Sequence, residues 1–121
     1  MPREGYLTKT AQYAQVYENG RSWVNGLVVM RALSNGLTLT RYGLSVSKRL
    51  GGAVVRNRVK RLLREILRLT PVKEGWDIVF IARPAAAGAD YAGLEKAVKD
   101  LLSQAELLLT REDEKVCLNT D

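Results

Sequence analysis

The sequence contains no histidine and a single cysteine, Cys117. Without histidine there is no imidazole for acid-base catalysis, no Ser-His or Cys-His nucleophile, and no Cys/His zinc site with four protein ligands. A single cysteine also excludes a disulfide within the chain. Catalysis by the protein itself would therefore have to use carboxylates, with magnesium as the natural metal.

Long hydrophobic runs are missing as well. No stretch approaches the roughly 20 apolar residues that a membrane-spanning helix requires, and Met1-Pro2-Arg3-Glu4 leads into no signal-peptide core. We therefore predict no membrane partner and a cytoplasmic location. The 121 residues, 46% of them hydrophobic, suit one domain with one core. We expect this domain over residues 1–110 and an acidic, mobile tail over residues 111–121.

Acidic residues are scarce where basic residues gather. The net charge is +6, and nine of the 19 Lys and Arg residues lie between Arg41 and Arg68, against one acid, Glu65. A surface charged only for solubility would mix the two signs and pair them along helices. The segregation therefore favours a polyanionic partner, although a plain solvated basic face remains the alternative.

Hydrophobic periodicity predicts three helices and three strands, in the order helix, strand, strand, helix, strand, helix. The helices are expected over Leu7 to Asn19, Ala53 to Leu69, and Tyr91 to Leu109, the last capped by Asp90. Strands are expected over Trp23 to Leu33 and Leu37 to Val46, which should pair as a hairpin, and over Asp77 to Ala82. This order predicts an α+β fold, with helices packed on one small, mixed central sheet.

The predicted helix from Ala53 to Leu69 is amphipathic. At about 100° per residue, one arc holds the apolar side chains of Val55, Val59, Leu62, Ile66 and Leu69. An adjoining arc holds Arg56, Asn57, Lys60, Arg61, Arg64 and Arg68. Arginine predominates there, which suits bidentate phosphate contacts and stacking on bases. One face should therefore bury against the sheet while the other presents cations on a rigid base.

Two features of this region have two interpretations each. Gly51 and Gly52, just before the helix, would let an RNA backbone approach the free N-H groups of its first turn, or they simply form a strand-to-helix turn. Asn57 is a poor helix former that either hydrogen-bonds a nucleotide or metal-bound water, or caps the preceding turn.

The segment from Leu50 to Arg64 resembles the signature of the protein subunit of bacterial ribonuclease P. It contains the Arg56-Asn57-Arg58 motif, follows Gly43-Leu-Ser-Val-Ser-Lys48, and precedes Asp77-Ile-Val-Phe-Ile-Ala-Arg83 at the right distance. The resemblance covers about Leu7 to Leu109. It implies a fold similar to domain 2 of ribosomal protein S5, with a left-handed β-α-β crossover, although crossovers are in general right-handed.

In that family a large RNA uses metal ions to remove the 5′ leader from precursor tRNA, and the protein assists. The resemblance implies that this chain binds the ribonuclease P catalytic RNA and the single-stranded leader of precursor tRNA. It also implies that the chain has no catalytic residue of its own, and that Mg²⁺ acts through the RNA, with no dedicated site on the protein. The RNA-binding residues would be Lys48, Arg49, Arg56, Asn57, Arg58, Lys60, Arg61, Arg64 and Arg68.

The leader cleft of the family lies between the first helix and the sheet. The resemblance places Tyr13, Tyr17, Arg31, Ser45 and Ser47 there. Tyr13 and Tyr17 lie four residues apart on one helix face, so they are suited to stack on bases, although core packing is the ordinary role of such a pair. Two positions depart from the family pattern: Lys9 stands in a segment with few basic residues, and Arg31 stands where some members have an aromatic residue.

Two other functions compete with this interpretation. A protein-only endonuclease would need carboxylates such as Glu65, Asp77 or Asp90 to hold magnesium, and no acidic pair has a spacing that demands it. A structural RNA-binding protein or an RNA chaperone, such as a ribosomal protein, would fit the basic helix equally well.

Overall fold

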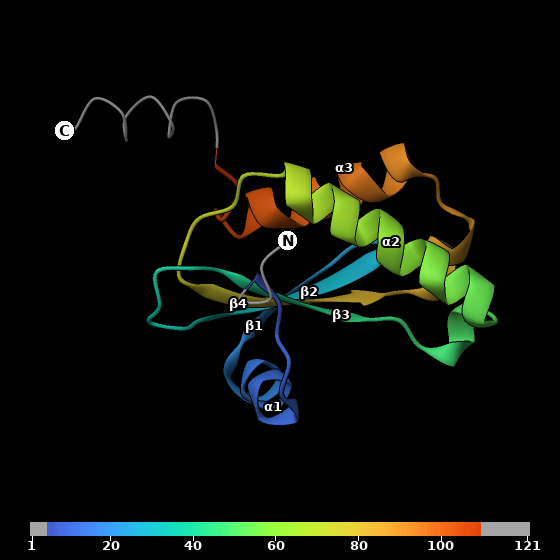
Figure 1. The fold of residues 1–121 in the computed structure, drawn as a ribbon. Helices are drawn as coiled ribbons and strands as arrows, with labels where there is room; N and C mark the ends of the chain where they lie inside the picture. The colour runs from blue at the N-terminus through green and yellow to red at the C-terminus, as the bar shows by residue number, and fades with distance from the viewer. Residues whose placement is uncertain (1–4, 110–121) are drawn as a thin grey trace.

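The computed structural model describes residues 5–109, which form one sheet with helices on both faces (Figure 1). The short 3-10 helices η2 (Lys48–Leu50) and η3 (Pro84–Gly88) follow β3 and β4. The main elements are α1 (Thr10–Asn19), β1 (Arg21–Val24), β2 (Val28–Ser34), β3 (Arg41–Ser45), α2 (Ala53–Leu69), β4 (Trp76–Ala82) and α3 (Tyr91–Gln104). The predicted tail over 111–121, with Cys117, lies outside the described residues, and the boundary at 110 stays a prediction.

The sheet has the strand order β1-β2-β4-β3. β2 pairs antiparallel with both β1 and β4, whereas β3 pairs parallel with β4. The sheet is therefore mixed, as predicted, and the α+β class is confirmed. Helix α2 makes the crossover between β3 and β4, the connection for which the resemblance implies a left-handed path. Within residues 5–109, no helix has both the length and the apolar character needed to cross a membrane.

One strand was missed, because the predicted strand from Trp23 to Leu33 is two strands joined by a turn. Asn25 makes this turn: its Oδ1 accepts hydrogen bonds from the backbone N-H groups of Leu27 (3.0 Å) and Val28 (2.9 Å). Its Nδ2 donates to the Ala97 carbonyl oxygen in α3 (2.9 Å). An Asn-Gly pair within a run of apolar residues is a typical turn signal, and here it separates β1 from β2.

The predicted hairpin between the segments Trp23 to Leu33 and Leu37 to Val46 is wrong. β4 lies between β2 and β3, so that Phe80 pairs with Met30 on one side and with Leu44 on the other. β4 is the most apolar strand, and the central position of the sheet buries it on both faces. Its insertion is a long-range event that the local pattern around Ser34 to Gly36 does not reveal.

Two helices are shorter than predicted. α1 begins at Thr10, because the preceding segment runs beside β3: Tyr6 and Tyr42 form a parallel bridge, and the Leu7 N-H donates to the Tyr42 carbonyl (2.7 Å). α3 ends at Gln104, and Glu106 follows with a positive φ of 61°, which breaks helical geometry. The predicted cap is confirmed, since Asp90 Oδ1 accepts from the Gly93 N-H (2.8 Å).

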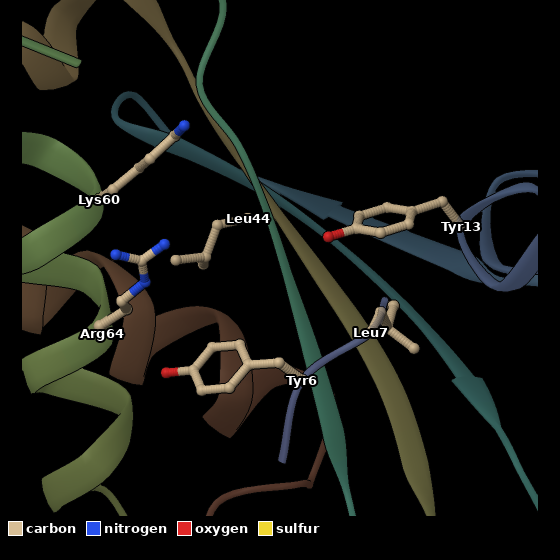
Figure 2. A pocket seen from close by; sticks show the side chains of 6 residues that line it. All are labelled: Tyr6, Leu7, Tyr13, Leu44, Lys60 and Arg64. Carbon is tan, nitrogen blue, oxygen red and sulfur yellow. The ribbon is translucent and has the colours of Figure 1, made fainter. Parts of the chain in front are cut away.

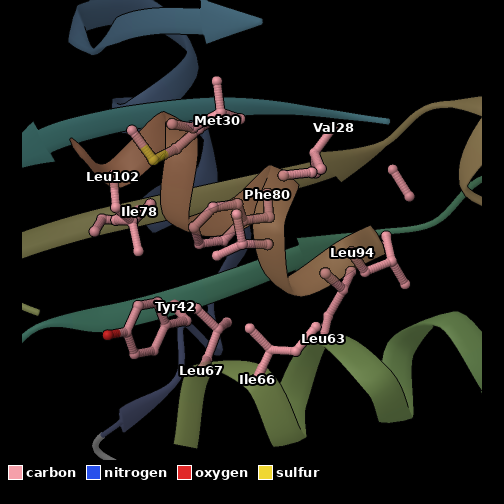
Figure 3. Close-up of a cluster of buried hydrophobic side chains, with 14 of the residues drawn as sticks. Val28, Met30, Tyr42, Leu63, Ile66, Leu67, Ile78, Phe80, Leu94 and Leu102 are labelled. Carbon is pink, nitrogen blue, oxygen red and sulfur yellow. The ribbon is translucent and has the colours of Figure 1, made fainter. Parts of the chain in front are cut away.

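The main core lies between the sheet and the helices α2 and α3 (Figure 3). Phe80 and Met30 from the sheet, Leu63 and Ile66 from α2, and Leu94 from α3 are fully buried. A second, smaller cluster lies on the other face of the sheet, under α1, and consists of Leu7, Val16 and Val79. The sheet is thus covered on both faces, with the deeper core under α2.

The buried stripe of α2 differs from the predicted arc. Val59 and Ile66 are fully buried as expected, but Leu69 is 57% exposed, and Leu63 and Leu67 complete the stripe. The buried stripe is therefore shifted around the helix toward the basic arc, where Arg56 and Lys60 are half-buried. Arg61, Arg64 and Arg68 stay exposed.

Candidate nucleic-acid interface

The N-terminal end of α2 is shaped by a turn that requires glycine. Gly51 has φ = 144°, a conformation that other residues rarely adopt, and a Cβ there would also approach Val55 at 3.3 Å. Ser47 caps η2, accepting a hydrogen bond from the Arg49 N-H at 3.3 Å. The turn therefore explains Gly51 by itself, while Gly52 faces open space and leaves the first turn of α2 accessible.

The predicted basic residues divide into engaged and free side chains. Arg58 Nη2 donates to the Ala89 carbonyl (2.8 Å), and Arg68 forms a bidentate pair with Glu65 (2.6 and 3.1 Å). Arg56 is half-buried, and its Nε has no hydrogen-bond partner. Arg58 therefore helps to hold α2 against the loop before α3, and Arg68 is partly neutralised by its neighbour.

The remaining cations of α2 make no ion pair within residues 5–109. Arg61 and Arg64 are exposed and Lys60 is half-buried, all three at helical spacing on one side of α2. Near the N-terminal end of the helix, Lys48, Arg49 and Asn57 are exposed as well. Asn57 makes no side-chain hydrogen bond within the described part of the chain, so the capping interpretation receives no support.

Glu65 and Arg68 form an exposed ion pair on α2. Arg68 hydrogen-bonds Glu65 and thereby lowers the pKa of its carboxyl group. Glu65 is therefore charged at neutral pH and occupied by Arg68. Of the cations of α2, only Arg68 has a carboxylate partner within residues 5–109, so Lys60, Arg61 and Arg64 are not neutralised in this way.

On the other face of the sheet, Tyr13 lies directly against β3. A Cβ on Gly43 would stand 2.5 Å from a ring carbon of Tyr13, so only glycine leaves room for the ring. Ser45 is two residues further along β3 and shares the face of Gly43. Tyr13 is half-buried in the small core, whereas Tyr17 is 39% exposed. Tyr13 is therefore partly packed into the small core, and the side chain of Tyr17 is partly exposed to solvent.

Arg31 is tied to the end of α1. Its Nη2 donates to the Tyr17 carbonyl oxygen (2.6 Å), and its guanidinium carbon lies 5.9 Å from the centre of the Tyr17 ring. A cation near the carbonyl oxygens at a helix C-terminus is favourable. Arg31 thus positions α1 and Tyr17. Through the register Arg31–Val79–Gly43 it shares the face of the sheet with Tyr13 and Ser45, while Ser47 caps the following η2 turn.

A cavity of about 290 Å³ opens between α2 and the N-terminal segment, at the β3 edge of the sheet (Figure 2). Four of its lining residues are aromatic or apolar and two are cationic: Tyr6, Leu7, Tyr13, Leu44, Lys60 and Arg64. Sequence analysis missed Tyr6, Leu7 and Leu44. No local signal points to them, because their position depends on the segment before α1 lying beside β3.

The carboxylates of the endonuclease alternative all have structural partners. Asp77 is buried and accepts hydrogen bonds from Arg41 Nε and Nη2 (2.8 and 2.7 Å) and from Asn35 Nδ2 (2.9 Å). The hydrogen bond to Asp77 raises the pKa of Arg41. Glu65 is paired with Arg68, and Asp90 caps α3. Within residues 5–109, no three His, Cys, Asp or Glu side chains come together as a metal site would require.

Comparisons with known proteins agree with one another. Residues 1–106 match the family model described as Ribonuclease P. The chain is 49% identical, over all 121 residues and the whole length of the relative, to the ribonuclease P protein component of Dehalococcoides mccartyi strain CBDB1. It resembles the solved structure of the Staphylococcus aureus RNase P protein, with a TM-score of 0.80, 30% identity, and coverage of 87% of this chain and 98% of that one. The Thermotoga maritima RNase P protein matches with a TM-score of 0.73, 28% identity, and coverage of 82% and 96%.

Proposed function

The chain belongs to the ribonuclease P protein family, and from that premise we propose that it is a binding subunit which contributes no catalytic group to the reaction. It is an RNA-binding subunit of ribonuclease P and acts in tRNA processing. The observation that carries the proposal is the row of Lys60, Arg61 and Arg64. These cations have no carboxylate partner within residues 5–109 and stand on a helix anchored in the main core.

The α2 face is the proposed contact with the catalytic RNA. Phosphate groups favour guanidinium and ammonium groups held at fixed spacing. The exposed Lys48, Arg49 and Asn57 extend this surface past the N-terminal end of α2. In this proposal Arg58 mainly holds the backbone at Ala89, and Arg68 mainly holds the Glu65 side chain.

The face of the sheet under α1 is the proposed site of the single-stranded leader. Support comes from the exposure of Tyr17, from the half-buried Tyr13 ring against Gly43, and from the guanidinium of Arg31 beside Tyr17. Stacking of one base on an aromatic side chain stabilises single-stranded RNA binding by roughly 1 to 3 kcal/mol. Arg31 would steady the rings and Ser45 would offer a hydroxyl.

Magnesium enters this proposal through the RNA. Support comes from the partners of Asp77, Glu65 and Asp90, which engage these carboxylates elsewhere, and from the lack of any group of three acidic side chains within residues 5–109. In the holoenzyme the ion would neutralise phosphate charge and activate water. The cytoplasmic location expected from the sequence stays a prediction.

Reconstitution tests the non-catalytic role. The purified chain alone should cleave no precursor tRNA at any magnesium concentration, and it should restore efficient cleavage to the catalytic RNA at low magnesium. Metal-dependent cleavage by RNA-free protein, abolished by Asp77→Asn or Glu65→Gln, would contradict the proposal. An unchanged cleavage rate after adding the protein to the catalytic RNA would contradict it too.

Substrate preference tests the leader site and separates it from a general RNA chaperone. The holoenzyme should bind precursor tRNA more tightly than mature tRNA, and the double variant Tyr13→Ala/Tyr17→Ala should lose most of that difference. A chaperone or ribosomal protein would bind both RNAs alike. If the double variant kept the wild-type preference, the leader assignment would fall.

A further inference from the structure

Tyr6 is held in place beside the edge of the sheet, outside the predicted binding sets. The parallel bridge between Tyr6 and Tyr42 and the hydrogen bond from the Leu7 N-H to the Tyr42 carbonyl (2.7 Å) fix its backbone. The Tyr6 ring lies 6.2 Å, centre to centre, from the buried ring of Tyr42, which in turn lies 6.5 Å from Phe80. The ring is therefore an ordered aromatic surface that continues outward from the main core.

Two cations line the same cavity as this ring. Lys60 and Arg64 are one helical turn apart on α2, and Figure 2 shows the Arg64 guanidinium beside Leu44, between Tyr6 and Lys60, whose side chain extends farther along the gap between α2 and the sheet. Neither forms an ion pair within residues 5–109. Burial raises the pKa of Tyr6 while the charge of Arg64 opposes the shift, so the phenol stays neutral at pH 7 and Arg64 lies close to it.

A second cavity of about 230 Å³ adjoins the first and shares Tyr6 and Arg64 with it. Its other lining residues are Arg61, Glu65 and Arg68. Tyr6 and Arg64 thus stand between two hollows, with four cations and one carboxylate along the α2 side. Such a groove, with cations along one wall and a ring on the other, has the character of a site for single-stranded nucleic acid.

We propose that Tyr6, Lys60 and Arg64 form a nucleotide pocket of the leader path, with one unstacked base on the Tyr6 ring and its phosphate on the two cations. This inference rests on the proposed function, because it extends the leader path from the α1 face around β3 to the near edge of α2. Lys60 and Arg64 then contact the leader, and Arg61 with Lys48 and Arg49 remains for the catalytic RNA. A volume of about 290 Å³ lies at the lower end of the range of pockets for small ligands, which suits one nucleotide unit and not a helix.

The leader is the occupant that the lining favours. Tyr13 borders both this cavity and the face under α1, so one extended strand can contact Tyr17, Tyr13 and Tyr6 in turn. A base must also be unstacked to lie against the ring, and the leader is single-stranded along its length. Sequence-specific or stacking contacts with RNA require such exposed bases.

The test is a scan of the leader with single abasic sites, each of which removes one base but leaves its phosphate. Dissociation constants are measured for precursor tRNA and the holoenzyme carrying wild-type protein, Tyr6→Leu or Tyr6→Phe. Leucine keeps apolar packing against Tyr42 without an aromatic ring, and phenylalanine keeps the ring. The control is Trp23→Ala, which removes an aromatic ring beside Arg21 at the opposite edge of the sheet.

With wild-type protein, one leader position should show an abasic penalty of about 5- to 150-fold that vanishes in Tyr6→Leu. Tyr6→Phe and Trp23→Ala should keep that penalty. A Tyr6→Leu profile identical to wild type overturns the inference, and the proposed function survives if removing the whole leader still weakens binding. Loss of affinity for the catalytic RNA alone, with an unchanged leader profile, also overturns it, because the pocket then serves the other RNA. A flat profile with no leader effect in wild type instead contradicts the proposed function itself.

Discussion

The two faces of the sheet differ in how deeply they are packed. Under α2 and α3 lies a broad core with fully buried Phe80, Met30, Leu63, Ile66 and Leu94. Under α1 the fully or mostly buried cluster consists of Leu7, Val16 and Val79. The deep core supports a helix of 17 residues that carries like charges, and the shallow one supports a helix of 10 residues whose aromatic side chains stay partly exposed.

This difference explains how α2 holds its cations together. Like charges at i,i+4 on an exposed helix, such as Lys60 and Arg64, cost about 0.2 to 0.5 kcal/mol per pair. Burial of a single large side chain such as Leu63 contributes about 1.5 to 3 kcal/mol. The stabilisation from the core therefore exceeds the repulsion several times over, and α2 can present its positive charges with Glu65 as its one acidic residue. The cluster under α1 buries fewer apolar side chains, and the Tyr13 ring packs against it.

The largest effect should come from truncating the deep core. Phe80 belongs to β4, which lies between β2 and β3, and its ring is fully buried. Phe80→Ala should therefore lower the free energy of unfolding by about 3 to 5 kcal/mol. Val16→Ala in the shallow cluster should cost only about 2 kcal/mol. Denaturant unfolding of both variants measures the difference. Equal losses would show that the two faces do not differ in the way described.

Gly43, beside Tyr13, is a position where a substitution should disturb the face of the sheet under α1 and leave the core under α2 intact. Gly43→Ala places a methyl group 2.5 Å from the present ring position, so the Tyr13 ring must move. Overpacking of this kind costs about 1 to 3 kcal/mol, and the preference for precursor over mature tRNA should fall with no tyrosine replaced. Affinity for the catalytic RNA should stay near wild type. A retained substrate preference would mean that the position of the Tyr13 ring does not matter.

Salt dependence should distinguish free from engaged cations on α2. Arg61→Ala should weaken binding to the catalytic RNA and reduce the slope of log K against log salt by about 1, as for the loss of one phosphate contact. Arg68→Ala, the matched variant two turns further, should change the slope less, because Arg68 is already bound to Glu65 at 2.6 Å. Equal slopes for the two variants would remove the distinction between free and engaged side chains.

The smallest effect is expected from the acid on the basic face. Glu65→Gln releases Arg68 and removes the one negative charge of α2, so binding to the catalytic RNA should tighten slightly at low salt. Arg68 holds the pKa of Glu65 below its ordinary value of 4.5, so the pair is intact at neutral pH and is lost only as the pH falls through that lowered value. RNA affinity of the wild-type protein should therefore show no step from this pair between pH 6 and pH 8. Weaker binding by Glu65→Gln would contradict this account.

Amphipathic phasing was enough to predict α2 and its basic face. Val59 and Ile66 are buried where the pattern placed them. Leu69 is exposed because it is the last residue of the helix, where the chain turns away through Thr70, whose hydroxyl donates to the Ile66 carbonyl at 2.6 Å. Hydrophobic periodicity predicts which side of a helix is buried, but it does not show at which residue the neighbouring elements stop covering that side.

Strand pairing was the part that the sequence could not show. Apart from the division between β1 and β2, the strands were recognisable by composition, yet β2 pairs with β4, more than 40 residues away, and not with β3, which follows it in the chain. The same long-range arrangement creates the Tyr6 cavity, since the segment before α1 lies beside β3 only once β3 has become an edge strand. Arg31 was likewise assigned to the leader, and the structure adds that it holds the end of α1.

The central claim is that the two faces bind different RNAs, and one paired titration tests it most directly. The variants Arg49→Ala/Arg61→Ala and Tyr13→Ala/Tyr17→Ala are each measured for affinity to the catalytic RNA and, in the holoenzyme, for the ratio of precursor to mature tRNA affinity. The arginine pair should lower the first quantity and leave the ratio nearly unchanged, and the tyrosine pair should do the reverse. If both pairs lowered both quantities to the same extent, the division of labour between the two faces would be contradicted.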